Sequence, residues 1–253
     1  MNFEDYIYLK KSHIKNLKSY SKELERLYGK EIDLLSGSMK YSQDSLVVKF
    51  ICENIPPGSK ILDVGGAYSR ILSHFHPKGY ECWLIDSFEG LGNGTVAIPV
   101  RPYKIIVGYM GDFIKELPDQ YFDFVFSISA LEHSPWEDEY SQRIIDDINR
   151  VLKPGGMSLH CLDSFLKPDY LNIHPFIRKA FDSGLVLGSL PNYADIATDE
   201  DTFFTSRQDI EHWMQVSNSG LTVEEFIRTY GKPFTIQVLW QKPIDTQNTL
   251  SGF

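Results

Sequence analysis

Short, almost uninterrupted apolar segments recur through the middle of the chain. Five of them are expected to be strands, and they cover residues 60–66, 80–86, 103–112, 122–133 and 155–163. Strands that are apolar on both faces are typical of a parallel sheet with helices on both sides. Between the fourth and fifth strands, one helical face is apolar, and Pro154 with two glycines ends that helix. The alternation predicts an α/β fold with a doubly wound sheet.

The segment before the first strand has helical spacing instead. Residues 3–35 carry an apolar stripe at intervals of three and four, formed by Leu17, Tyr20, Leu24, Leu27 and Tyr28. A second helix is predicted over 43–54 and must end before two prolines. We therefore predict an N-terminal helical cap over 1–57, a main domain over 58–243 and a flexible tail over 244–253.

The end of the chain departs from the strand–helix alternation. A helix is predicted over 206–220 with Ser206 as its N-cap. Residues 221–231 and 233–243 are then expected to be two antiparallel strands, because a short glycine-containing connection joins them. Residues 164–205 are an insert that is not part of the strand–helix alternation, and they contain a long loop. We predict that this insert covers a substrate.

Composition and charge exclude some classes of function. The net charge of −9 argues against a nucleic-acid substrate. No apolar run is long enough to span a membrane, and the first residues lack the apolar core of a secretory signal. Cys52, Cys82 and Cys161 are expected to be reduced, as in a cytoplasmic protein. The first 30 residues are mildly basic; a solvated helix face explains this, although such a face would also attract an anionic small substrate.

The stretch "ILDVGGAYSR" places small residues directly after the first strand. Gly65, Gly66 and Ala67 let the backbone approach a ligand closely, and the next helix begins where an anion could bind. The anion could be a pyrophosphate or an amino-acid carboxylate. Asp86 follows Gly65 by 21 residues (86 − 65) at the end of the second strand. A carboxylate at that distance suits the two hydroxyls of a ribose and repels a 2′-phosphate.

Four segments together resemble the class I S-adenosylmethionine-dependent methyltransferases. They are "ILDVGGAYSR", "LIDSFEG", "GDFIKELPDQYFDFVFSISALEH" and "INRVLKPGG", in family order over residues 55–165, with a weaker match to about residue 242. The resemblance implies a Rossmann-like, mostly parallel seven-stranded sheet with an antiparallel C-terminal hairpin. It also implies S-adenosylmethionine as cofactor and S-adenosylhomocysteine as product.

The resemblance also implies roles at the cofactor. Asp63 would order the glycine turn near the methionine part of the cofactor. The remaining roles are to pass beneath the cofactor (Gly65, Gly66, Ala67), to hold the ribose (Asp86), to meet the adenine (Asp112, Phe113) and to lie at the methionine end (Ser129, Ala130). Ser87 is also expected to bind the cofactor. Ala67 stands where the family has a glycine, so a positive φ at that position would count against the site.

Candidates for catalysis lie after the fourth and fifth strands. His133 has an ordinary pKa suited to proton abstraction near neutrality, although a structural role explains it as well. Asp163 could bind a substrate hydroxyl or a metal. His174 and Tyr193 in the insert are candidates for substrate binding, whereas His160 is expected to be a hydrogen-bonded core residue. No metal site is predicted.

We therefore predict a methyltransferase that acts on a small polar metabolite. The stretch "DSFEGLG" resembles a narrower group of sugar-directed O-methyltransferases and favours an oxygen acceptor over nitrogen. The alternatives are an NAD-dependent oxidoreductase and a non-catalytic partner subunit that binds S-adenosylmethionine. The helical cap could also form the contact of a homodimer.

Overall fold

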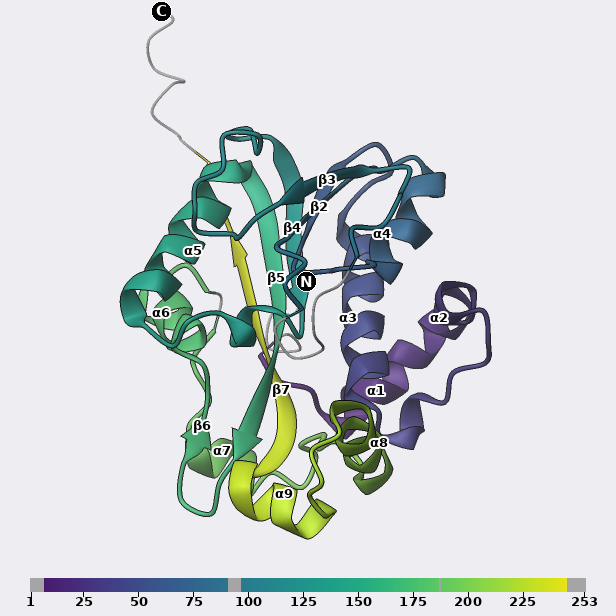
Figure 1. The fold of residues 1–253 in the computed structure, drawn as a ribbon, viewed down its shortest axis with the longest axis vertical. Helices are drawn as coiled ribbons and strands as arrows, with labels where there is room; N and C mark the ends of the chain where they lie inside the picture. The colour runs from purple at the N-terminus through teal and green to yellow at the C-terminus, as the bar shows by residue number, and fades with distance from the viewer. Residues whose placement is uncertain (1–6, 91–96, 187, 245–253) are drawn as a thin grey trace, which may run out of the picture.

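The computed structural model describes residues 7–90, 97–186 and 188–244 and is built around one sheet (Figure 1). Its strands are β1 (Lys60–Val64), β2 (Glu81–Asp86), β3 (Lys104–Val107), β4 (Phe122–Ile128), β5 (Leu152–Leu166), β6 (Leu171–Asn172) and β7 (Lys232–Gln241). The order is β3-β2-β1-β4-β5, and both β6 and β7 pair with β5. The pairs among β1 to β5 are parallel, which confirms the predicted mostly parallel seven-stranded α/β fold.

Two helical layers cover the sheet, because successive strand residues point to opposite faces. Ile61, Leu84 and Phe124 pack towards α3 (Met39–Asn54) and α4 (Arg70–Phe75). Their neighbours Leu62 and Val125 pack towards α5 (Asp138–Val151) and α6 (Pro175–Asp182). Helices lie on both sides of the sheet (Figure 1), and the strands are buried on both faces, which explains their almost uninterrupted apolar sequences.

The N-terminal region is broken into shorter helices than the sequence predicted. Within the described residues it forms α1 (Lys11–Leu17), a 3-10 turn (Lys18–Tyr20) and α2 (Ser21–Tyr28) instead of one helix over 3–35. Gly29 ends α2 in the left-handed conformation, with φ 66°. Leu17 and Leu24 of the apolar stripe are buried in the same core as α3, so the helices still use the predicted face.

The predicted C-terminal hairpin is wrong, although the antiparallel orientation of the last strand is confirmed. Residues 221–231 contain α9 (Val223–Tyr230), which begins with a capping box between Thr222 and Glu225. Val223 packs with α8 (Arg207–Ser217), which itself begins after the expected N-cap Ser206. The capping box and the apolar face of α9 outweigh the β propensity of this segment. The partner of β7 is β5, in antiparallel register along ten residue pairs.

The insert over 164–205 holds more regular structure than the sequence predicted. The insert begins within the last part of β5. It continues into β6, which pairs with the end of β5, and then into α6 and α7 (Tyr193–Ala197). Phe176 and Ile177 of α6 are buried against the sheet beside α5. Much of the insert therefore extends the helical layer on the sheet. That the remaining residues of the insert cover a substrate stays a prediction. No helix in the described parts of the chain is long and apolar enough to cross a membrane.

Candidate functional site

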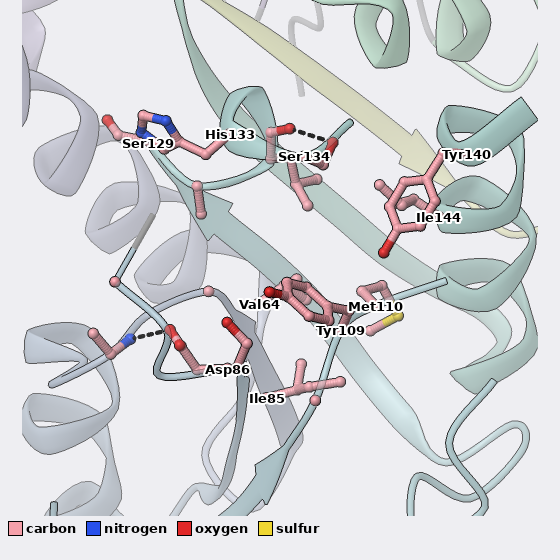
Figure 2. A pocket seen from close by; sticks show the side chains of 17 residues that line it. Val64, Ile85, Asp86, Tyr109, Met110, Ser129, His133, Ser134, Tyr140 and Ile144 are labelled. Carbon is pink, nitrogen blue, oxygen red and sulfur yellow. Dashed lines mark hydrogen bonds between the residues drawn. The ribbon is translucent and has the colours of Figure 1, made fainter. Parts of the chain in front are cut away.

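A pocket opens where the carboxyl ends of β1, β2 and β4 meet, which is where open α/β sheets bind ligands (Figure 2). Ser129 and His133 lie together at one end, and Met110, Tyr140 and Ile144 lie at the other (Figure 2). The lining residues come from the segments after four strands and from α5. They include Gly65 and Ala67 after β1, Asp86 and Ser87 at the end of β2, Gly108 to Met110 after β3, Ser129 to Leu131, His133 and Ser134 after β4, and Tyr140 and Ile144 on α5.

The glycine turn lets two strand ends approach closely beneath the pocket. Gly65 has φ 73°, and a Cβ at this position would lie 2.6 Å from the Cβ of Ala130. Asp63 lies under Gly66, where a Cβ would come within 2.2 Å of its Oδ2 atom. Ser69 donates a 2.5 Å hydrogen bond to that oxygen and caps α4. Burial raises the pKa of Asp63 to about 7. Asp63 therefore supports the turn from below and does not line the pocket itself.

Ala67 takes the conformation that the sequence analysis identified as unfavourable. Its φ is 46°, in the left-handed region where residues with a Cβ are strained by roughly 1–2 kcal/mol. Its N–H donates a 2.8 Å hydrogen bond to Oδ2 of Asp86, which holds it there. The turn therefore keeps the shape that a glycine would give, at a cost in stability.

Replacing Ala67 by glycine should raise the free energy of unfolding by about 0.5 kcal/mol. Relief of the left-handed strain outweighs the entropy that glycine adds to the unfolded chain, which is roughly 0.4–1 kcal/mol. Urea denaturation measures the difference. Ala194→Gly is the matched control because Ala194 is exposed within α7, and this change should lower stability by about 0.5–1 kcal/mol. Equal destabilisation by both changes would contradict the strain at Ala67.

Asp86 has the geometry expected of a ribose-binding carboxylate. Oδ2 accepts the N–H of Ala67, and Oδ1 accepts the N–H of Phe88 at 2.7 Å. Each carboxylate oxygen can accept a second hydrogen bond, so both stay available to a pair of hydroxyls. Ser87 lines the pocket beside it. These residues fit a nucleoside of the cofactor that the sequence predicted.

The end of the pocket formed by Met110 and Ile144 differs from the adenine site that the sequence predicted. Asp112 is exposed and pairs with Arg143 at 3.2 Å, and Phe113 is 42% exposed. Neither side chain lines the pocket, so their contact with adenine stays a prediction. The apolar side chains of Met110 and Ile144 line this end instead.

Asp147 on α5 organises this end of the pocket and was missed by the sequence analysis. Its buried carboxylate accepts the N–H of Gly111 at 2.8 Å and of Phe113 at 3.2 Å, both through Oδ2. Its Oδ1 accepts a 2.8 Å hydrogen bond from Arg150. A signal was present in the sequence, because Asp147 follows Ile144 by three positions and so interrupts the apolar face of the helix.

Ser129 connects the end of the pocket next to β4 to the N-terminal helices. It has φ 47°, and its Oγ lies 2.7 Å from Oε1 of Gln43 and 3.0 Å from Oδ1 of Asp163. Gln43 on α3 also donates to Asp163 at 2.9 Å. A strained residue at a strand end is a frequent feature of functional sites. The predicted residue Asp163 thus lies one hydrogen bond away from the pocket.

His133 and Glu132 occupy the turn after β4 in different environments. His133 is exposed and lines the mouth of the pocket. Glu132 points inward, and its Oε1 accepts the N–H of Asp163 at 3.3 Å. Burial and the negative charge of Asp163 raise the pKa of Glu132 well above its ordinary value. The sequence contained no signal for this buried carboxyl group.

His160 and His174 both have structural partners. Both ring nitrogens of His174 are used, since Nδ1 accepts the N–H of Phe176 and Nε2 lies 3.1 Å from the carbonyl oxygen of Ser134. His160 is buried between Ser127 and Ser158, and burial lowers its pKa to about 3. His160 is therefore the core histidine that the sequence predicted, whereas His174 caps α6.

The remaining sequence candidates lie outside the pocket lining. The hydroxyl of Tyr193 donates a 2.5 Å hydrogen bond to the carbonyl oxygen of Pro168. Substrate binding by Tyr193 or His174 therefore stays a prediction. Cys52, Cys82 and Cys161 are free thiols. Among residues 7–90, 97–186 and 188–244, no group of three or more His, Cys, Asp or Glu side chains could hold a metal ion.

Comparison with known proteins gives partial matches in sequence. Residues 62–159 match the family model described as a methyltransferase domain. A sterol 24-C-methyltransferase of Yarrowia lipolytica is 33% identical over 108 residues, which is 41% of this chain and 27% of that protein. An uncharacterized protein of Mycobacterium tuberculosis is 30% identical over 124 residues, or 46% of this chain and 38% of that protein. The matches therefore span less than half of either curated relative.

Solved structures share the fold at low sequence identity. Phosphoethanolamine N-methyltransferase 2 of Haemonchus contortus, in complex with phosphomonomethylethanolamine and S-adenosylhomocysteine, has a TM-score of 0.51 and 14% identity. That match covers 91% of this chain and 57% of the other. The 4+2 cyclase SpnF has a TM-score of 0.54 and 14% identity, and the match covers 94% of this chain and 98% of the cyclase.

Proposed function

We propose that this chain is a class I S-adenosylmethionine-dependent methyltransferase that transfers a methyl group to a small polar metabolite. The match of residues 62–159 to a methyltransferase domain supports this proposal. The observation that carries the proposal is the position of Asp86. Its carboxylate lies at the end of β2 in a pocket whose opposite wall is the end of β4, with the closely packed Gly65 turn below. This arrangement suits a nucleoside joined to an amino acid.

Different residues of the pocket would contact different parts of the cofactor. Asp86 and Ser87 would hold the ribose, and Ile85, Met110 and Ile144 would surround the adenine. The backbone of Gly65 and Ala67 would pass beneath the methionine part, next to Ser129 and Ala130. S-Adenosylmethionine, when bound, supplies a methyl group activated on a sulfonium, and the protein supplies the position of the acceptor.

We favour an oxygen acceptor over nitrogen. A hydroxyl must lose its proton, and the turn after β4 presents His133 at the mouth of the pocket with Asp163 behind Ser129. Lys40, half-buried on α3 near the end of β4, supports an anionic substrate. The similar proteins are named as carbon and nitrogen methyltransferases. The preference for an oxygen acceptor is therefore supported only by His133, Asp163 and Lys40. A homodimer and a cytoplasmic location stay predictions.

Calorimetry with S-adenosylhomocysteine and with NAD tests the proposed cofactor. We expect binding of S-adenosylhomocysteine and no binding of NAD, and the reverse result would favour the oxidoreductase. Incubation with cell metabolites and a methyl-labelled cofactor then tests transfer. Cofactor binding without any labelled product would favour a non-catalytic subunit or a different reaction, as the cyclase that shares this fold illustrates.

A further inference from the structure

Glu132 carries a buried oxygen atom that no group in the described structure satisfies. Its Oε1 accepts the N–H of Asp163, but its Oε2 has neither solvent contact nor a hydrogen-bond partner. An ionised carboxylate left in this state costs much more free energy than a protonated one. The geometry therefore favours a neutral Glu132 in the cofactor-free protein.

Asp163 is held next to Glu132 by hydrogen-bond donors from other elements. Its Oδ1 accepts a hydrogen bond from Gln43 and can accept one from Ser129. Among the described residues, its Oδ2 has no side-chain hydrogen bond. Lys40 on α3 and Asp209 near α3 are the other charged groups that act on this pair. Burial and the charge of Asp163 both oppose ionisation of Glu132.

The carboxyl pair also has a direct connection to the cofactor pocket. Ser129, which lines the methionine end, lies within 3.0 Å of Asp163. A positive charge at that end of the pocket would act on the pair across a poorly hydrated region. Coulomb interactions are stronger there than in water, so a cation would favour loss of the proton.

We propose that Glu132 is protonated in the cofactor-free protein and loses this proton when a sulfonium occupies the pocket, and that the substrate hydroxyl then passes its own proton to Asp163 through the hydroxyl of Ser129. The proposal rests on the proposed function. The acceptor oxygen exchanges its proton for the methyl group, the sulfonium becomes a neutral thioether, and Ser129 passes the proton on to Oδ1 of Asp163. Ser129 is the catalytic residue because it lines the pocket, and Asp163, Glu132 and Gln43 act through it as positioning residues.

The test compares S-adenosylmethionine with S-adenosylhomocysteine, which lacks the positive charge. Calorimetric titrations near neutral pH, in buffers with different ionisation enthalpies, give the number of protons released on binding. We expect the intact protein to release nearly one proton more with S-adenosylmethionine than with S-adenosylhomocysteine. Equal release with the two ligands would overturn the proposal, whereas failure of both to bind would instead refute the proposed function.

Two variants test whether the released proton comes from Glu132. Glu132→Gln keeps the shape of the side chain and should remove the difference between the two ligands while both still bind. Glu137→Gln changes an exposed carboxylate nearby and should leave the difference intact. A difference that persists in Glu132→Gln would overturn the assignment. If that variant does not fold, infrared spectra of the intact protein decide, because the band of a protonated carboxyl group must weaken when S-adenosylmethionine binds.

Discussion

Replacement of Asp86 by alanine is expected to weaken the affinity for S-adenosylhomocysteine by about a hundredfold or more. Each hydrogen bond from a ribose hydroxyl to a charged acceptor contributes roughly 1.5–3 kcal/mol, and a hundredfold change corresponds to about 2.7 kcal/mol. The carboxylate also accepts the N–H groups of Ala67 and Phe88. The alanine variant therefore loses both the ribose partner and the group that shapes the turn beneath the cofactor.

Calorimetry on Asp86→Ala and Asp86→Asn separates these two contributions. The asparagine variant keeps an oxygen for one N–H but loses the charge, so its affinity should lie between those of the intact protein and the alanine variant. Glu116→Gln is the control, since Glu116 is an exposed carboxylate outside the pocket. An alanine variant that binds within threefold of the Glu116 control would show that Asp86 does not hold the ribose.

Replacement of Asp147 by alanine is expected to lower the free energy of unfolding by about 3–5 kcal/mol. The change removes one charged partner of Arg150, whose guanidinium keeps its ion pair with Asp119 at 2.5 Å. It also leaves the N–H groups of Gly111 and Phe113 without their acceptor. Because these residues follow Met110 in the pocket wall, binding of S-adenosylhomocysteine should weaken as well.

Urea denaturation of Asp147→Ala and Asp146→Asn measures this effect with a matched control. Asp146 is exposed on the same helix, so its replacement should change stability by less than about 0.5 kcal/mol. The predicted signature is a lower transition midpoint in the Asp147 variant with an unchanged slope. Equal stability of the two variants would mean that the turn after β3 does not depend on Asp147.

Local patterns predicted the architecture of the central sheet well. Apolar runs located the parallel strands, because burial on both faces leaves a mark in each strand separately. The interval between Gly65 and Asp86 located two sides of the pocket, because a single strand–helix–strand unit places both residues. The prediction of a strand over 221–231 was wrong because it followed the β propensity of the segment and not the helix-starting capping box at Thr222 and Glu225.

The sequence by itself determined the strands, the glycine turn and the acidic residue at the end of β2, because each depends on neighbours within a single supersecondary unit. Only the tertiary structure decided which side chains meet around the pocket. Gln43 and Asp163 are 120 positions apart, and β7 finds its partner in β5 rather than in the preceding segment. The isolation of Glu132 is likewise a property of its surroundings, because burial of a carboxyl oxygen depends on every element packed around it.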